Sequence, residues 1–354
     1  MTSDNELVPQ MPRRAHQRPE GEDSSLALDT RSRAVIQQLV DEKRAALEYV
    51  HGRDVLHRDV KLENLLVNTD VLVDSVHFSD RTTSPVDVGW RAVAANLSDL
   101  AASGAVAVDG ITVALVAPGG THWSWVEDLY RGISEALSCY GGILLGGDCS
   151  AGKQRLVSIT ALGRMGPLRL HRADARPGDW LVTSGAHGLS RLGLALLEGD
   201  PELNDFVALT DDLRHRAISR HQRPIPRLDA LNTLLAHKPD NLPWRAAGTD
   251  SSDGLLTAVQ ALCSSSLCGA VLTREWLPRA RDWPGGDRWD EWCLNGGEDF
   301  ELVLALPATW AQRWLDHQPD SRQIGWITAK CHEILWSDTQ LPVAAGGFDH
   351  FDQS

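Results

Sequence analysis

Strand-type and helix-type segments alternate along residues 65–162, and this alternation limits the fold more than any other feature of the chain. Residues 65–73 are rich in Leu and Val, as in a strand, with a polar Thr69-Asp70 pair in the middle. Ser84 and Pro85 are the start signal of a helix that ends at Gly104. A strand at 111–116, a helix at 123–140, a strand ending at 146–148 and a strand at 156–162 follow. We therefore predict an α/β fold, with helices on a mixed sheet.

A turn at residues 177–179 precedes the next strand, 180–184, and we place a domain boundary close to it. Beyond the turn the pattern predicts helices at 190–197, 211–220, 226–236, 253–265 and 307–317, and strands at 300–306 and 323–328. A chain of 354 residues is long enough for two domains. We predict an N-terminal domain at 65–175 and a C-terminal α/β domain at 176–354.

Residues 1–64 do not continue this pattern. The first 30 residues are rich in Pro, Arg, Glu and Asp and show no apolar period, which is typical of a disordered segment. Apolar residues at helical spacing between Arg31 and Val50 favour one helix. We predict an arm that is largely disordered or helical.

The charge of the chain excludes several classes of partner. Lys and Arg number 34 against 48 Asp and Glu, a net charge of −14, so we expect neither a nucleic-acid nor a membrane partner. The N-terminus lacks the apolar core of a signal peptide, and no apolar run approaches the roughly 18 residues of a membrane span. The six cysteines form no C-x-x-C pair, so we expect a reduced, cytoplasmic location and no zinc-thiolate site.

Five separated acidic motifs carry the chemistry of the chain. They are Thr69-Asp70, Asn96-Leu97-Ser98-Asp99, Gly146-Gly147-Asp148, Asp250-Ser251-Ser252-Asp253-Gly254 and Gly296-Gly297-Glu298-Asp299. Phosphoryl transfer from ATP requires neutralisation of several phosphate oxygens, which Mg²⁺ held by carboxylates provides. Glycine lets the backbone approach a nucleotide closely. Each motif alone is a common turn or solvated face, but together they predict a Mg²⁺- and ATP-dependent kinase.

The motifs also carry a family resemblance. DVLVDSVHF, TTSPVDVGWRAVAANLSDLAASGA, LLGGDCS, DSSDGL, GGEDFELVL and the terminal GFDHF are similar to segments of bacterial thiamine-monophosphate kinases. The resemblance implies the two-domain PurM-like fold shared with aminoimidazole ribonucleotide synthetase, selenophosphate synthetase and a hydrogenase-maturation protein. It also implies a homodimer with ATP near the dimer interface. The implied reaction converts ATP and thiamine monophosphate into ADP and thiamine diphosphate.

Roles for individual residues follow from the resemblance, motif by motif. The implied Mg²⁺ ligands are Thr69, Asp70, Asp99, Asp148, Asp250 and Asp253, with Asp148 and Asp253 as the catalytic pair. The implied ATP contacts are Gly147, Asp148, Arg172 and Ser252. The implied substrate contacts are His77, Glu298 and an aromatic residue, Phe348 or Phe351, that stacks on the thiamine ring. Because the acceptor is a phosphate oxygen that is already anionic near neutral pH, we expect direct in-line transfer without a strong general base.

The N-terminal region departs from the family pattern. The family's G-D-D segment has its nearest candidate at Gly21-Glu22-Asp23, more than forty residues before Thr69. The intervening HRDVKLEN, residues 57–64, resembles the catalytic loop of protein kinases, but no Gly-rich loop or D-F-G accompanies it, so we do not predict protein-kinase activity. Two alternatives to an active kinase stay open: a catalytically impaired nucleotide-binding homologue, and another enzyme of the PurM-like superfamily.

Overall fold

The computed structural model describes residues 64–201, 203 and 209–343. The chain divides into the units Met1–Val60 and Lys61–Ser354, and every described residue belongs to the second unit. The helix predicted between Arg31 and Val50, the G-D-D candidate, residues 57–63 of HRDVKLEN and both terminal phenylalanines lie outside the described residues.

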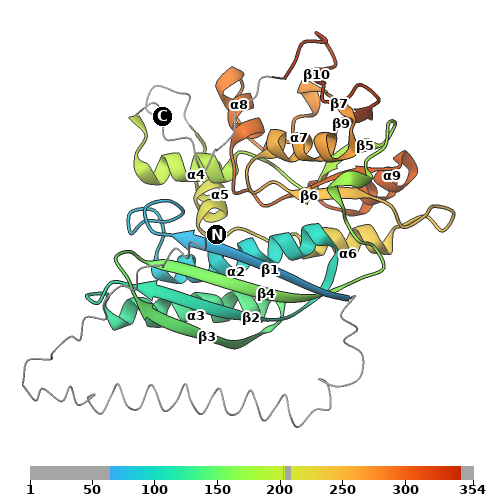
Figure 1. Ribbon diagram of the computed structural model, residues 1–354. Helices are drawn as coiled ribbons and strands as arrows, with labels where there is room; N and C mark the ends of the chain where they lie inside the picture. The colour runs from blue at the N-terminus through green and yellow to red at the C-terminus, as the bar shows by residue number, and fades with distance from the viewer. Residues whose placement is uncertain (1–63, 202, 204–208, 344–354) are drawn as a thin grey trace, which may run out of the picture. The chain divides into compact units, whose positions relative to one another are not determined.

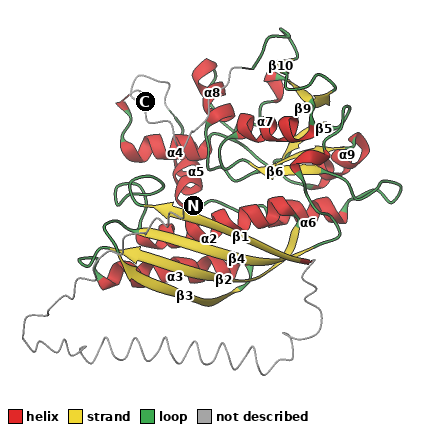
Figure 2. Ribbon diagram, viewed as in Figure 1, coloured by secondary structure: helices red, strands yellow, loops and turns green. Residues whose placement is uncertain are grey.

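The first sheet has four strands in the order β1 (Leu65–Val73), β4 (Leu156–Met165), β2 (Ala105–Ala117) and β3 (Ile143–Ala151). It is mixed, because β2 and β3 are parallel while both partners of β4 are antiparallel to it. Helices α2 (Pro85–Ser103) and α3 (Trp123–Tyr140) cover one face of the sheet (Figures 1 and 2). Their apolar residues form one buried core with the sheet.

Helix α2 has the ends that its sequence predicts. Ser84 has extended backbone and its side chain accepts a hydrogen bond from the amide of Asp87, while Pro85 occupies the first turn. Gly104 ends the helix with φ of 97°, a conformation that glycine adopts without strain. Helices α2 and α3 cross closely at Gly89 and Gly132, because a Cβ on either glycine would meet backbone of the other helix.

The second sheet has six strands in the order β10 (Ile334–Trp336), β7 (Gly269–Leu272), β9 (Arg322–Thr328), β5 (Trp180–Thr183), β8 (Leu302–Leu306) and β6 (Ala247–Asp250). Strand β8 is completely buried, and its sequence LVLAL is apolar throughout. Val303 and Ala305 belong to one core cluster, whereas Leu302 and Leu304 belong to another. The alternation shows that this sheet has a packed core on each face.

Six α-helices accompany the second sheet among the described residues. They are α4 (Leu189–Glu198), α5 (Asp211–Gln222), α6 (Leu228–Ala236), α7 (Leu255–Ser266), α8 (Asp287–Asn295) and α9 (Ala308–His317). Trp310 and Trp314 of α9 are buried, and each indole N–H donates to a backbone carbonyl of α6. No helix in the described ranges is long and apolar enough to cross a membrane.

Most of the predicted elements are confirmed within one or two residues, and the α/β class is confirmed. The prediction that β3 ends at Gly146-Gly147-Asp148 is wrong, because the strand continues beside β2 to Ala151. The short strands β6, β7 and β10 were missed, since AGTD, GAVL and ILW are too short to show a period. Helix α8 was also missed. Strand β2 begins at Ala105, well before the predicted start at 111.

The crossing of α2 and α3 yields a stability prediction. A Cβ at Gly132 would lie 1.8 Å from the carbonyl oxygen of Val86, so Gly132→Ala must separate the helices. We expect a loss of about 1–3 kcal/mol in the free energy of unfolding, although Gly→Ala normally stabilises a helix. Urea denaturation measures it. Gly120→Ala is the control, because no atom lies within 4 Å of its Cβ position, and equal stability of the two variants would contradict the prediction.

Candidate active site

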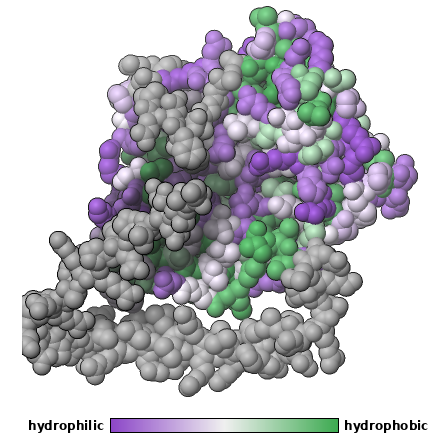
Figure 3. Space-filling model, in the orientation of Figure 1, coloured by the Kyte–Doolittle hydropathy of each residue, from purple (hydrophilic) through white to green (hydrophobic). Residues whose placement is uncertain are grey.

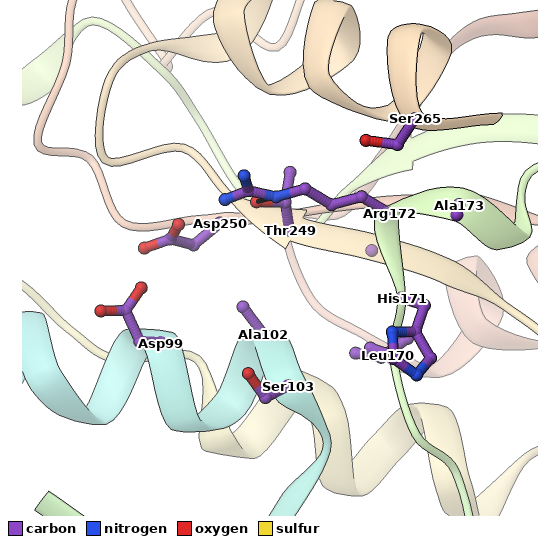
Figure 4. Close-up of a pocket in the computed structure, with 11 residues that line it drawn as sticks. Asp99, Ala102, Ser103, Leu170, His171, Arg172, Ala173, Thr249, Asp250 and Ser265 are labelled. Atoms are coloured by element: carbon purple, nitrogen blue, oxygen red, sulfur yellow. Dashed lines mark hydrogen bonds between the residues drawn. The ribbon is translucent and has the colours of Figure 1, made fainter. Parts of the chain in front are cut away.

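A cavity of about 380 Å³ lies between the end of α2, the segment before β5 and strand β6 (Figure 4). Its wall combines residues from both halves of the unit, listed here in chain order: Asp99, Ala102, Ser103, Leu170, His171, Arg172, Ala173, Gly248, Thr249, Asp250 and Ser265. Three of the residues that the sequence singled out, Asp99, Arg172 and Asp250, therefore share one cavity.

The carboxylates of Asp99 and Asp250 point toward each other across this cavity (Figure 4). Asp250 is the last residue of β6 and is buried; Ser98 Oγ donates to its Oδ2 at 2.7 Å and Ser252 Oγ to its Oδ1 at 3.3 Å. Asp99 accepts a hydrogen bond of 2.7 Å from Asn68 Nδ2 of β1. Both carboxylates are thus oriented by neutral donors.

The surroundings of Asp99 and Asp250 disfavour the ionised form of both carboxyl groups. Burial, followed by the charges of Asp250 and Asp70, raises the pKa of Asp99 to about 7. Burial also raises the pKa of Asp250, and the nearby charge of Asp253 adds to the increase. Arg172 acts in the opposite direction on both carboxyls. The cavity therefore concentrates negative charge that only one cavity-lining arginine offsets.

Arg172 extends into the cavity from the segment before β5 (Figure 4). Its Nε donates to Thr249 Oγ1 at 3.2 Å. Guanidinium groups are suited to phosphate oxygens because they offer several donors in a rigid fork. The cavity thus presents one guanidinium group that can donate to phosphate oxygens, together with two carboxylates.

Side chains alternate between the two faces of β1, and this alternation separates Thr69 from Asp70, which the sequence predicts to act together. Asn68 faces α2, because its side chain bonds to Asn96 and Asp99 of that helix. Asp70 lies two residues later and shares this face, whereas Thr69 lies on the opposite face, where its hydroxyl is 2.8 Å from that of Thr160. Asp70 thus belongs with Asp99, and Thr69 does not.

The Gly147-Asp148 pair lies outside the cavity. Strand β3 is separated from β1 by β2 and β4, so about 14 Å divides the two edge strands. In register, Asp148 is opposite Ala114 of β2, which is opposite Ser158 of β4. Asp148 therefore shares the open face of the sheet with Thr69.

A second group forms around Glu298, on the loop before β8. The amide of Glu298 donates to the carbonyl of Ser252 at 2.7 Å, which joins the GGED loop to the DSSDG turn. Its carboxylate pairs with the buried Arg91 of α2 and lies 3.8 Å from His221 Nδ1. Burial favours the neutral acid, but Arg91, His221 and His77 outweigh it, so the pKa of Glu298 is lowered. The structure thus places His77 and Glu298 in one neighbourhood, while Phe351 lies outside the described residues.

Asp299, the neighbour of Glu298, has a different role. Its carboxylate is fully buried and accepts hydrogen bonds from the amides of Gly188, at 2.6 Å, and Ser190, at 2.9 Å. Burial raises its pKa to about 7 in spite of these bonds. Asp299 thus caps the start of α4, which is a structural role.

Several residues of the site were missed in the sequence. Asn68 and Ser98 orient the two cavity carboxylates, while Arg91 and His221 contact Glu298. A signal existed for Arg91, because a single charge stands among apolar residues at a buried position of a helix. No comparable signal marks Asn68 or His221, whose partners are distant in sequence.

The donor set fits Mg²⁺ only together with a ligand. Among the described residues, no three His, Cys, Asp or Glu side chains form a group that could hold a metal ion. Mg²⁺ in phosphoryl-transfer sites is commonly held by one or two carboxylates plus water and substrate phosphates. Asp99 and Asp250, whose charges repel each other, match that arrangement.

Comparisons with known proteins show similarity over most of the chain. The family model for the N-terminal domain of AIR synthase related protein matches residues 54–165. The thiamine-monophosphate kinase of Prochlorococcus marinus is 50% identical over 319 residues, 89% of this chain and 95% of that protein.

Solved structures show the same likeness. A structure of AaThiL complexed with AMPPCP and TMP has a TM-score of 0.70 at 27% identity, covering 88% of this chain and 96% of that chain. The thiamine-monophosphate kinase of Stenotrophomonas maltophilia has a TM-score of 0.70 at 28% identity, covering 86% and 96%. These likenesses confirm the expected fold.

The pKa of Asp99 predicts a pH-dependent stability in metal-free buffer. Its folded pKa of about 7 exceeds the unfolded value of about 4, so its contribution is fully present below about pH 4 and is lost as the pH rises through about 7. Asp99→Asn removes this titration. We expect the melting temperature of Asp99→Asn, relative to that of the wild type, to be higher at pH 8 than at pH 5. A stabilisation of about 1 kcal/mol corresponds to a rise of about 2–4 °C in melting temperature.

Thermal unfolding in EDTA at the two pH values measures the difference. Asp240→Asn is the control, since Asp240 is an exposed turn residue outside the cavity. The same difference between Asp99→Asn and wild type at both pH values would contradict the assignment.

Proposed function

The chain belongs to the thiamine-monophosphate kinase family, and on that premise we propose that the cavity of Asp99, Arg172 and Asp250 binds the phosphates of Mg²⁺-ATP. The chain transfers a phosphoryl group from ATP to thiamine monophosphate, which yields ADP and thiamine diphosphate. The observation that carries the assignment of the cavity is that Asp99 and Asp250 line it together, where burial, followed by the charge of Asp250, raises the pKa of Asp99.

The carboxylates supply the cation-binding side of the proposed site. Asp99 and Asp250 would hold Mg²⁺, with Asp70 beside Asp99 and Asp253 beside Asp250. An ion held by these carboxylates would neutralise negative charge on the phosphates. Ser98 and Ser252 hold Asp250 in place by hydrogen bonds, so the carboxylate needs little reorganisation when a ligand arrives.

Transfer is direct and in line in this proposal. The acceptor phosphate is already anionic near neutral pH, so no residue has to remove a proton from it. Arg172 orients phosphate oxygens, and the remaining side chains fix the two substrates relative to each other. Positioning and charge neutralisation are therefore the main work of the site.

The Glu298 group is the proposed site for the cationic part of thiamine monophosphate. Opposing charges lower the pKa of Glu298, so it is a carboxylate at neutral pH and suits the positive thiazolium ring. Its amide bond to Ser252 ties it to the loop that carries Asp250 and Asp253. This connection supports a substrate site next to the phosphate site, with His77 nearby.

The two predicted domains divide this work only in part. Residues 65–175 supply Asp99 and Arg172, and residues 176–354 supply Asp250 and Glu298. We assign ATP binding and dimerisation mainly to the first range and substrate binding to the second. A cytoplasmic location is consistent with the six free thiols, all of which lie in described segments.

The open face of the first sheet supports a homodimer. Strands β1 and β3 are edges, and their side chains Val67, Ile143 and Leu145 are exposed by 59%, 37% and 46%. Hydrophobic residues gather in this region of the molecule (Figure 3). If β3 of each copy lies beside β1 of the other, the two sheets close into a barrel that removes both edges and covers the apolar face. Asp148 of the partner subunit then lies across the seam from β1, the strand that carries Thr69 and Asp70.

Replacement of Asp250 tests the phosphate site. Asp250→Asn keeps the shape and the contacts to Ser98 but removes the charge, so we expect kcat for thiamine diphosphate formation to fall by about 100-fold or more. Product formation from ATP, Mg²⁺ and thiamine monophosphate measures the change, with Asp240→Asn as the control. A decrease of less than about threefold in a folded Asp250→Asn protein would refute the assignment.

Mixed dimers test the contribution of Asp148. We expect Asp99→Asn and Asp148→Asn each to be inactive alone. When the two variants are unfolded together and refolded, half of the dimers are mixed, and one of the two sites in each mixed dimer is intact if Asp148 acts across the interface. Recovery of about a quarter of wild-type activity is therefore expected. No recovery, despite mixed dimers detected by mass spectrometry, would place Asp148 in its own subunit's site.

A further inference from the structure

A second cavity, of about 530 Å³, lies beside α5 and shares no lining residue with the first. Seven arginines line it, against the carboxylates of Glu301 and Asp320. The lining therefore carries an excess of five positive charges in a chain whose net charge is −14. The phosphate site and the Glu298 group make no use of this cavity.

Elements of different sequence position build the basic wall. Arg216 and Arg220 are four residues apart on α5, so they lie on one face of that helix, and Arg223 is the residue that follows its end. Arg322 comes from the first residue of β9, and Arg281 from the loop before α8. The fold, and not a run of basic residues in the sequence, brings these arginines together.

Part of this charge is already neutralised inside the protein. Glu301 is fully buried and pairs with Arg220, at 3.2 Å, and with Arg227. Three more lining arginines pair with carboxylates that do not line the cavity: Arg216 with Asp212 at 2.8 Å, Arg223 with Asp87 and Glu135, and Arg279 with Asp290. These pairs hold the guanidinium groups in fixed positions.

Other guanidinium groups have fewer partners. Arg281 is 86% exposed and lies 3.8 Å from Asp282, and Arg322 makes no ion pair with any described residue. Their donors are available to a ligand. A cavity lined both by arginines that are held in ion pairs and by the less committed Arg281 and Arg322 is suited to an anion with several acceptor oxygens.

We propose that this second cavity binds a small polyanion that carries at least two linked phosphate groups. Arginine forks match phosphate oxygens in pairs, and Arg281 and Arg322 come from separate elements, so two linked phosphates can engage one fork each. The volume lies within the range of about 300–1,000 Å³ that is typical of small-molecule sites. Inorganic pyrophosphate is the minimal ligand of this class.

Calorimetric titration of the full chain with pyrophosphate tests the proposal. The buffer contains EDTA and little salt, because the first site needs a divalent cation and charge pairs weaken with ionic strength. We expect saturable binding that the double variant Arg281→Gln/Arg322→Gln weakens by about tenfold or more. Arg313→Gln, on the exposed side of α9 and outside the cavity, is the matched control. Absence of binding to wild type, or equal affinity of the double variant, would overturn the proposal.

Two further titrations separate this site from the proposed phosphate site. Asp250→Asn should bind pyrophosphate as wild type does, and loss of binding in that variant would assign the ligand to the first cavity and refute the second site. Thiamine diphosphate and ADP are compared with pyrophosphate under the same conditions. Equal affinities would assign recognition to the phosphates alone, and tighter binding of one organic diphosphate would identify the occupant; either result supports the site.

Discussion

The hydrogen bond from Ser98 to Asp250 is the interaction on which the candidate site depends. It joins α2, which is packed on the first sheet, to the end of β6 in the second sheet, and both residues are buried. A buried carboxylate without such partners would be strongly disfavoured. Asp99 follows Ser98 in the chain. Because the hydrogen bond holds Asp250 beside Ser98, it also determines that Asp99 and Asp250 face one cavity. The core contacts of α2 and the geometry of the site are therefore coupled.

Among the described residues, two kinds of buried or half-buried carboxylate differ in their partners. Glu301 is paired with two arginines and Asp299 caps a helix, so their charges or hydrogen bonds are satisfied within the fold. Asp99 and Asp250 instead have neutral donors and repel each other. Such repulsion lowers stability unless a cation enters, and this cost is typical of a site preorganised for a ligand. The repulsion between Asp99 and Asp250, more than the number of acidic residues, distinguishes the binding cavity.

Helix α5 connects two of the features described above, the Glu298 group and the second cavity. His221, on one side of it, contacts Arg91 and lies near Glu298, whereas Arg216 and Arg220 line the second cavity. Adjacent residues of a helix point about 100° apart, so one helix can contribute to two separate surfaces. The substrate group and the basic cavity are thus neighbours in the structure without sharing a lining side chain.

Local pattern in the sequence determined the long elements, such as β1, α2 and α3, because apolar period and cap residues act over a few neighbouring positions. The acidic motifs also identified the family and its chemistry. Only the tertiary structure decided which motifs meet: Asp70 faces α2 while Thr69 points away, and Asp148 lies on the far edge of the sheet. Strand order and helix crossing set these distances, and they depend on contacts between residues far apart in the chain, which no local pattern records. The arginine cavity was unpredictable for the same reason.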